Sequence, residues 1–207
     1  MNNNHHYLNL NGLVKSMKKT EKILIVLFIL GQIMRLTYLS GGTFISIFSG
    51  TLLATFYLIL SVPLMSGLNF KHLFSKNHQI KKYQIRLTFF LGISFCICTM
   101  GISFKLQIFT EANLFLFVGM LFLTGSSTLF VIKCRKARIY QDAIVRIISF
   151  AAVSGLLLII PFKSMVDLYF NKYPDYANAL KEQLDNPHDD EIRWKVLEER
   201  EKINHER

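Results

Sequence analysis

Two basic side chains interrupt apolar stretches in which a charge is expensive. Arg35 lies near the end of the run that begins at Ile23, and Lys105 lies inside the run from Leu87 to Ile108. A cation in a membrane span is a functional candidate by default, but a long side chain near a helix end can also reach the interface. Three interpretations stay open: snorkelling to the interface, pairing with a polar group inside a bundle, and handling of an ion or substrate.

One acidic residue lies close to this basic pair in the sequence. Glu111 follows Lys105 in the expected turn and could neutralise it across the interface. The other reactive residue types form no catalytic pattern, since no serine, cysteine or carboxylate stands beside a base at a telling spacing. No glycine-rich phosphate loop is present. We therefore expect a protein that is not an enzyme and has no catalytic residue, no metal site and no cofactor.

The three cysteines predict packing rather than redox chemistry. Cys96 and Cys98 lie inside an apolar run, and Cys134 lies among basic residues that we expect in the reducing cytoplasm. A structural zinc site needs about four ligands, and Cys-Ile-Cys has none nearby.

Long apolar runs predict an all-α membrane protein. Runs of about 18 or more residues are long enough to span a bilayer. Five are present, at 23–39, 44–64, 87–108, 113–132 and 143–161. The Gly-containing segment 40–43 predicts a tight turn between the first two, because glycine adopts dihedral angles that turns require.

Charge placement predicts the orientation of these spans. The net charge of +10 arises from basic clusters in the N-terminal tail and in the linkers 65–86 and 133–142. Basic loops stay in the cytoplasm, so an N-inside arrangement in the bacterial inner membrane is expected. The segment after Pro161, with eight Lys/Arg and eleven Asp/Glu, would then lie outside. Basic residues at the ends of apolar runs also argue against nucleic-acid binding.

The predicted organisation comprises seven segments. These are a cytoplasmic N-terminal tail (1–21), a first transmembrane hairpin (22–64), a basic cytoplasmic linker (65–86), a second hairpin (87–132), a second basic linker (133–142), a fifth span (143–161) and an acidic helical tail (162–207). The first linker is either a short interfacial helix or a solvated loop. Translation could begin at Met1 or Met17, because a basic stretch and an apolar run follow Met17.

An offset of seventy residues overlays the first two spans on the third and fourth. Gly31 then meets Gly101, and Arg35 meets Lys105. Two spans per copy predict a parallel repeat of two hairpins. Small residues predict the faces at which helices pack closely. These residues are Gly31, Ser46, Gly50, Ala54, Gly101, Gly119, Ala151 and Gly155.

The second hairpin resembles the transmembrane hairpin of GldL, a subunit of the gliding-motility and type IX secretion motor of Bacteroidota. The resemblance rests on Gly101-Ile-Ser-Phe-Lys-Leu and on Ala112-Asn-Leu-x-Leu-x-Val-Gly119, about twenty of the 207 residues. It implies an inner-membrane envelope machine. The departures are substantial, since the family's His, Trp and Pro are missing from the turn. The family's membrane-embedded glutamate would fall near Leu123, and Leu53 stands at the equivalent place in the first hairpin.

Three functions remain in view. The first is a subunit or accessory protein of an envelope complex, related to GldL but without its intramembrane acid and therefore unable to conduct protons. Its partners would be the lipid bilayer and another membrane or envelope protein. The second is a small carrier or channel built from a parallel repeat, and the third is a membrane enzyme.

Overall fold

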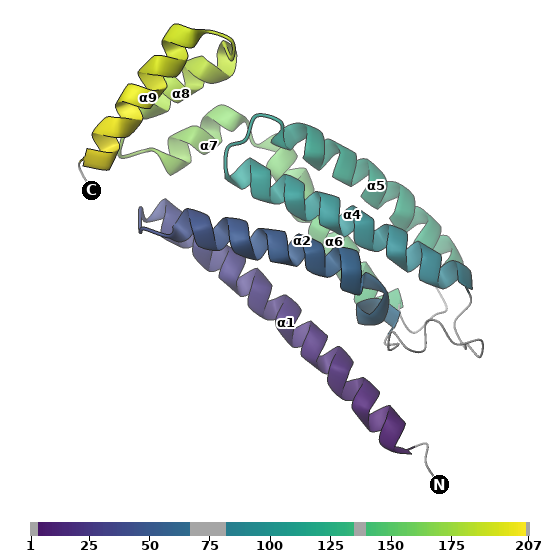
Figure 1. Ribbon diagram of the computed structural model, residues 1–207. Helices are drawn as coiled ribbons and strands as arrows, with labels where there is room; N and C mark the ends of the chain where they lie inside the picture. Colours follow the sequence, from purple (N-terminus) through teal and green to yellow (C-terminus); the bar gives the residue numbers. More distant parts are fainter. Residues whose placement is uncertain (1–3, 67–81, 135–139, 206–207) are drawn as a thin grey trace.

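The computed structural model describes residues 4–66, 82–134 and 140–205, and every regular element in these ranges is a helix. Figure 1 shows a bundle of long helices with shorter helices at one end. The long helices are α1 (Asn4–Leu36), α2 (Gly42–Ser66), α4 (Lys82–Leu106), α5 (Ala112–Cys134) and α6 (Tyr140–Ile159). The short ones are α7 (Phe162–Tyr169), α8 (Pro174–Asp185) and α9 (Asp190–His205). The all-α prediction is confirmed.

Four of the long helices are apolar and long enough to cross a membrane. The candidate spans are Gly42–Met65, Tyr83–Leu106, Ala112–Lys133 and Gln141–Ile159. The first predicted span, 23–39, belongs to α1, which is not among the candidates because its apolar part is confined between Lys22 and Arg35. The protein is therefore a multi-pass membrane protein with four candidate spans by length and composition.

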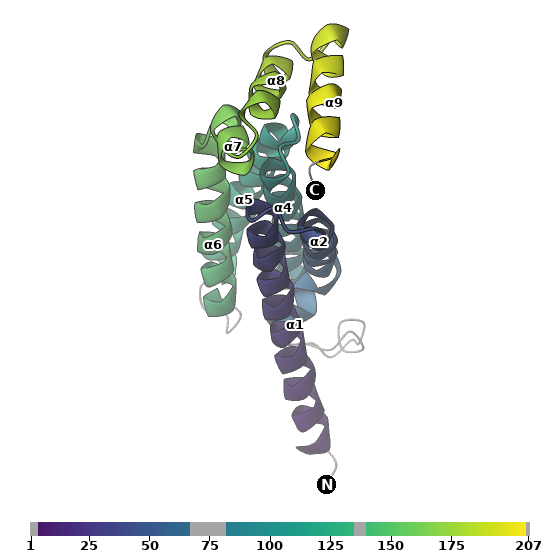
Figure 2. The same cartoon turned by 90° about the vertical axis from the view of Figure 1, so that its left-hand side faces the viewer.

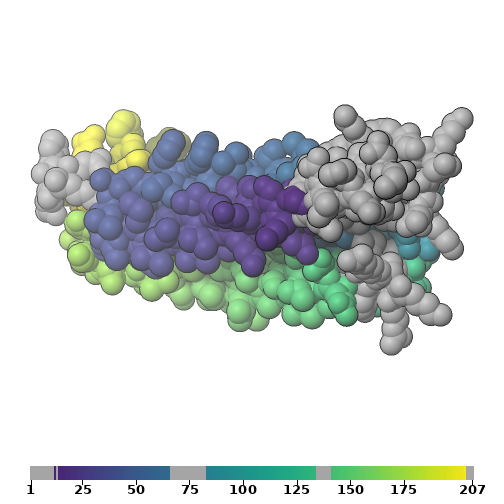
Figure 3. Space-filling model, turned by 90° about the horizontal axis from the view of Figure 1, so that it is seen from below, coloured from purple at the N-terminus to yellow at the C-terminus, as the bar shows by residue number. Residues whose placement is uncertain are grey.

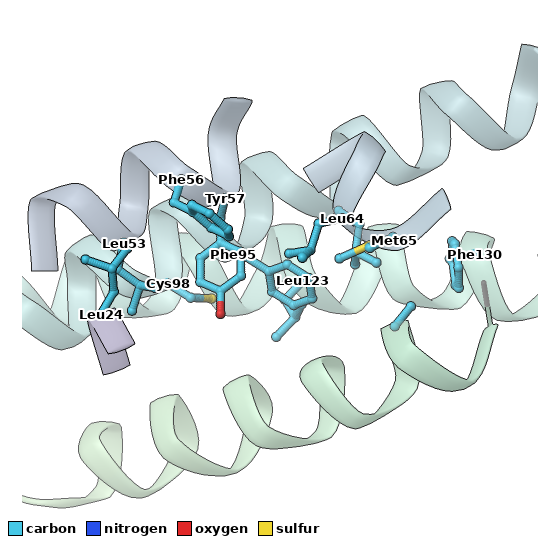
Figure 4. Close-up of a cluster of buried hydrophobic side chains, with 12 residues drawn as sticks. Leu24, Leu53, Phe56, Tyr57, Leu64, Met65, Phe95, Cys98, Leu123 and Phe130 are labelled. Atoms are coloured by element: carbon cyan, nitrogen blue, oxygen red, sulfur yellow. The ribbon is translucent and has the colours of Figure 1, made fainter. Parts of the chain in front are cut away.

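Helix α4 lies at the centre of the bundle. It packs against α2, α5 and α6, whereas α1 packs along α2. The main core contains Leu53, Tyr57, Phe95, Leu123 and Phe130, drawn from three helices (Figure 4). Large apolar side chains such as Phe44, Leu114 and Ile148 are exposed on the outside of the bundle. An apolar exterior around a packed core is what a lipid environment requires.

The turns that join α1 to α2 and α4 to α5 have the same backbone structure. Tyr38 and Ile108, seventy residues apart, both have positive φ, at 59° and 63°. The N–H of Leu39 donates to the carbonyl of Met34, and that of Phe109 donates to the carbonyl of Phe104. A positive-φ residue with this six-to-one hydrogen bond is the Schellman ending of a helix. Both hairpins thus close in the same way.

Helices α7 to α9 lie at the end of the bundle that holds these two turns, and the N-terminus lies at the opposite end (Figures 1 and 2). Pro174 is the first residue of α8, where its missing N–H costs no hydrogen bond. The carboxylate of Asp189 accepts hydrogen bonds from the backbone N–H groups of Glu191 and Ile192 and so caps the start of α9. The structure of the linker 67–81 lies outside the described residues, so the choice between interfacial helix and loop stays open.

The N-terminal part of the chain is helical from Asn4. Helix α1 continues without a break from the predicted tail 1–21 into the apolar part of the first hairpin. Figure 3 shows α1 along the surface of the bundle, with α2 on one side and α6 on the other. This placement brings charged residues of α1 against α6.

Candidate functional site: two buried polar clusters

The first cluster lies where the two hairpin turns meet α7, and we call it the turn-end cluster (Gln32, Arg35, Ser46, Lys105, Asn113, Phe162 and Tyr169). Lys105 is fully buried. Its Nζ donates to Asn113 Oδ1 at 2.7 Å and lies 3.9 Å from the ring centre of Phe162. Lys105 therefore pairs with a neutral amide and with the face of an aromatic ring.

Arg35 reaches the same place from the other hairpin. Its guanidinium donates to the backbone carbonyl of Leu106, the residue after Lys105. The guanidinium carbon also lies 4.5 Å from the ring centre of Tyr169. The two basic residues predicted to be equivalent thus lie at the same end of the bundle, each under one aromatic ring of α7.

Tyr169 links α7 to the interior through a short chain of hydrogen bonds. Its hydroxyl donates to Gln32 Oε1 at 2.9 Å, and the Gln32 amide donates to the hydroxyl of Ser46. Burial raises the pKa of Tyr169, so this hydroxyl stays protonated and remains a donor. Tyr38 adds a second attachment, because its hydroxyl donates to Asn171 Oδ1 at 3.0 Å.

The surroundings of Lys105 differ from the expected pair with Glu111. The partner of Lys105 is Asn113, and the carboxylate of Glu111 accepts a hydrogen bond from Thr110. The Lys105 side chain is buried, with its Nζ over the ring of Phe162 in α7. The sequence contains a signal for this helix. Phe162, Met165, Val166 and Tyr169 recur at the spacing of one helix face, which is typical of an amphipathic helix.

The second cluster, which we call the ion-pair cluster (Glu21, Tyr57 and Arg146), was missed by sequence reasoning. Glu21 of α1 is 6% exposed. Arg146 of α6 binds its carboxylate with two hydrogen bonds, Nε to Oε1 at 2.8 Å and a terminal nitrogen to Oε2 at 2.6 Å. The Tyr57 hydroxyl donates to the same Oε1 at 2.8 Å. One carboxylate therefore joins α1, α2 and α6.

This ion pair corrects the expectation that no acid lies inside the bundle. Tyr57 and Arg146 belong to the spans Gly42–Met65 and Gln141–Ile159, so Glu21 meets groups within the spans. Two planar hydrogen bonds to one carboxylate give a charge-assisted contact of fixed geometry. A second ion pair, Lys18 to Asp142 at 2.6 Å, lies nearby, but both of its side chains are substantially exposed.

Aromatic side chains lie against the ion-pair cluster. The ring of Tyr57 lies 5.5 Å from that of Phe95 and 5.3 Å from that of Phe150, and the latter two rings stack at 4.8 Å. Leu53 and Leu123, which stand where the resemblance implied an acid, are buried in the adjoining core. Packed rings and aliphatic chains thus occupy the middle of the bundle.

Most of the small residues predicted to mark helix contacts do so. A Cβ added at Gly31 would lie 2.7 Å from the backbone nitrogen of Ser46, and one added at Gly101 would lie 2.8 Å from that of Leu116. Gly50 and Gly119 are similarly tight against Ser103 and Cys98. Ala54 is buried and Ala151 packs against the core.

Two further findings refine the predictions for the spans. Gly155 has nothing within 4 Å of an added Cβ among the described residues, so the predicted close helix contact is not found there. Thr124, Ser127 and Thr128 donate to carbonyls of their own helix, as expected for hydroxyls in a span. Ser126 also reaches Ser94 of α4 at 3.0 Å.

No group of three or more His, Cys, Asp or Glu side chains that could hold a metal ion is found in the part of the chain that the structure describes. Comparison of the chain with protein-family models, with curated proteins and with solved structures gives no match.

Proposed function

We propose that this chain is a non-enzymatic subunit or accessory protein of a bacterial envelope complex, held in the inner membrane by its helical bundle. The observation that carries the proposal is the filled middle of the bundle. Tyr57, Phe95 and Phe150 pack ring against ring beside the ion-pair cluster. A carrier needs polar groups that are reached in turn from the two sides, and a packed aromatic core opposes that. The bundle is therefore best suited to anchoring.

We infer that the fold contains five spans, with α1 as the first. The support is that α1 packs along α2 and that its helix ending matches that of α4. The close approaches of Gly31 to Ser46 and of Gly101 to Leu116 also fall seventy residues apart. These equivalences favour two hairpins that are copies of one unit, arranged as a parallel repeat.

The inner membrane, with the N-terminus inside and the tail outside, completes the proposed arrangement. Lys15, Lys18 and Lys19 lie toward the N-terminal end of α1, opposite the two turns. The tail after Pro161 lies at the turn end and has more acidic than basic residues. Basic segments on one side and an acidic tail on the other follow the positive-inside pattern.

The resemblance to GldL directs the proposal toward an envelope machine. The residues that carry it, Gly101 and the Phe104–Lys105 pair, lie at the turn end of α4, with Asn113 at the start of α5. The tail supplies a surface for another envelope protein, because Trp194 of α9 is 72% exposed. In this arrangement the bundle anchors the protein and the outer helices contact the partner.

The second candidate function is a small carrier, and the ion-pair cluster is the observation that favours it. Glu21 is a buried acidic side chain inside the bundle, and Arg146 and Tyr57 bind its carboxylate. Against this, both oxygens of Glu21 are bound to a guanidinium. Coupled transport would have to break both of these charge-assisted hydrogen bonds, which opposes the carrier function.

We predict that the purified protein alone conducts no protons. In liposomes under a pH gradient, followed with an internal pH-sensitive dye, proton flux should equal that of empty liposomes. Flux that is lost on Glu21→Gln but retained in Asp142→Asn would contradict the anchor proposal and favour the carrier. Asp142 is the matched control because it is an exposed acid at the same end of the bundle.

A further inference from the structure

Arg35 and Lys105 are two cations at the turn end of the bundle, and the Arg35 guanidinium donates to the carbonyl of the residue that follows Lys105. Among the described residues, no carboxylate forms an ion pair with either of them. Their partners are the carbonyl of Leu106, the amide of Asn113 and two aromatic rings. We propose that this turn-end cluster is a binding site for a phosphate group, closed in the present structure by α7.

The closed arrangement compensates the two charges only in part. Removing a cation from water carries a large desolvation penalty, and ring faces and single carbonyl oxygens recover less of it than an anion does. A phosphate offers several charged oxygens, which suit the fork of an arginine and the point charge of a lysine together. An anion bound by these side chains would therefore compensate their charges more fully than the rings that now cover them.

Helix α7 has the features of a removable cover. Phe162 and Tyr169 lie on one helix face, seven residues apart, and each covers one of the two cations. Extended Pro161 precedes the helix, and residues 170–173 form a turn after it. Movement of this eight-residue helix would uncover both cations, and it would break the hydrogen bond from Tyr169 to Gln32. The ligand and the two rings thus compete for the same charges.

The position of the cluster in the bundle suits a lipid headgroup. Lys105 is the last residue but one of the span Tyr83–Leu106, and Asn113 is the second residue of Ala112–Lys133. Phosphates of a bilayer lie at the ends of spans, beyond the hydrocarbon core. A soluble phosphate could reach the same place from the aqueous side, so the test must separate the two sources.

The test is isothermal titration calorimetry on the full chain in a phosphate-free detergent, with dihexanoyl phosphatidylglycerol and inorganic phosphate as probes. We expect Lys105→Met to weaken binding about tenfold, because it removes one charge-assisted contact. We expect Phe162→Leu to strengthen binding about threefold, since it removes a competing ring but keeps both cations. Lys163→Met should leave the binding of both probes unchanged, because the Lys163 side chain is exposed and pairs with Asp185.

The outcomes of the titration distinguish a lipid headgroup from a soluble phosphate as the ligand. Binding of phosphatidylglycerol alone supports a lipid site, and binding of inorganic phosphate as well supports a soluble phosphate as the ligand. Binding that is equal in wild type, Lys105→Met and Phe162→Leu overturns the proposal, as does no binding of either probe. Phe162→Leu keeps the test decisive if loss of Lys105 prevents folding, because a site closed by α7 must bind better once that ring is gone.

Discussion

Arg146→Met should destabilise the protein by about 3–5 kcal/mol, because it leaves the buried carboxylate of Glu21 without its counter-charge. The two side chains are 14% and 8% exposed, so water cannot replace the lost partner. Glu21→Leu should have a similar effect through the unpaired guanidinium. The double variant should be more stable than either single variant, because no isolated charge remains. The measurement is the free energy of unfolding in detergent micelles.

Lys18→Met is the matched control for this prediction. Its ion pair with Asp142 is equally short, but its side chain is 40% exposed. An exposed ion pair contributes only about 0–1 kcal/mol. If the two single substitutions at Glu21 and Arg146 were additive in the double variant, the ion-pair cluster would not be coupled and its role in joining α1 to α6 would be refuted.

Gly101→Val and Gly31→Val should separate the helices of their hairpins. An added Cβ at either position would lie under 3.0 Å from backbone atoms of the facing helix, and backbone cannot move aside as a side chain can. Overpacking of this kind costs about 1–3 kcal/mol or more in tight places. Because the two glycines hold equivalent places, the two substitutions should have similar effects.

Gly155→Ala provides the opposite expectation within the same protein. Its added methyl group would meet nothing within 4 Å, and alanine is favoured over glycine in a helix by about 1 kcal/mol. This variant should be as stable as the wild type or slightly more so. If Gly155→Ala lost as much stability as Gly101→Val, a contact outside this chain rather than the hairpin geometry would determine the stability at position 155.

The apolar runs predicted the four candidate spans and the two turns to within a few residues. This works because a span is a local property, readable from a continuous segment. The seventy-residue offset likewise predicted which glycines lie against a neighbouring helix in each hairpin. Gly155 shows no such approach among the described residues, because a small residue indicates where close packing is possible but not which face meets a neighbour.

The ion-pair cluster could not be predicted from a continuous segment of the sequence. Glu21 and Arg146 are 125 positions apart, and each lies next to other charges at the edge of an apolar run. Only the packing of α1 beside α6 brings them together. Helix α7 was also not predicted, although the spacing of Phe162, Met165, Val166 and Tyr169 gives it one apolar face. Its place over Arg35 and Lys105 again depended on tertiary structure.

The most direct test of the whole account is the sidedness of the two ends of the bundle. Single cysteines at Lys15 and at Asn186, both exposed positions, would be placed in a Cys134→Ser background and treated with a membrane-impermeant maleimide in spheroplasts. A five-span protein with its tail outside predicts labelling at position 186 in intact spheroplasts and at position 15 only after permeabilisation. Labelling of both positions only after permeabilisation would place the two ends on one side of the membrane and contradict it.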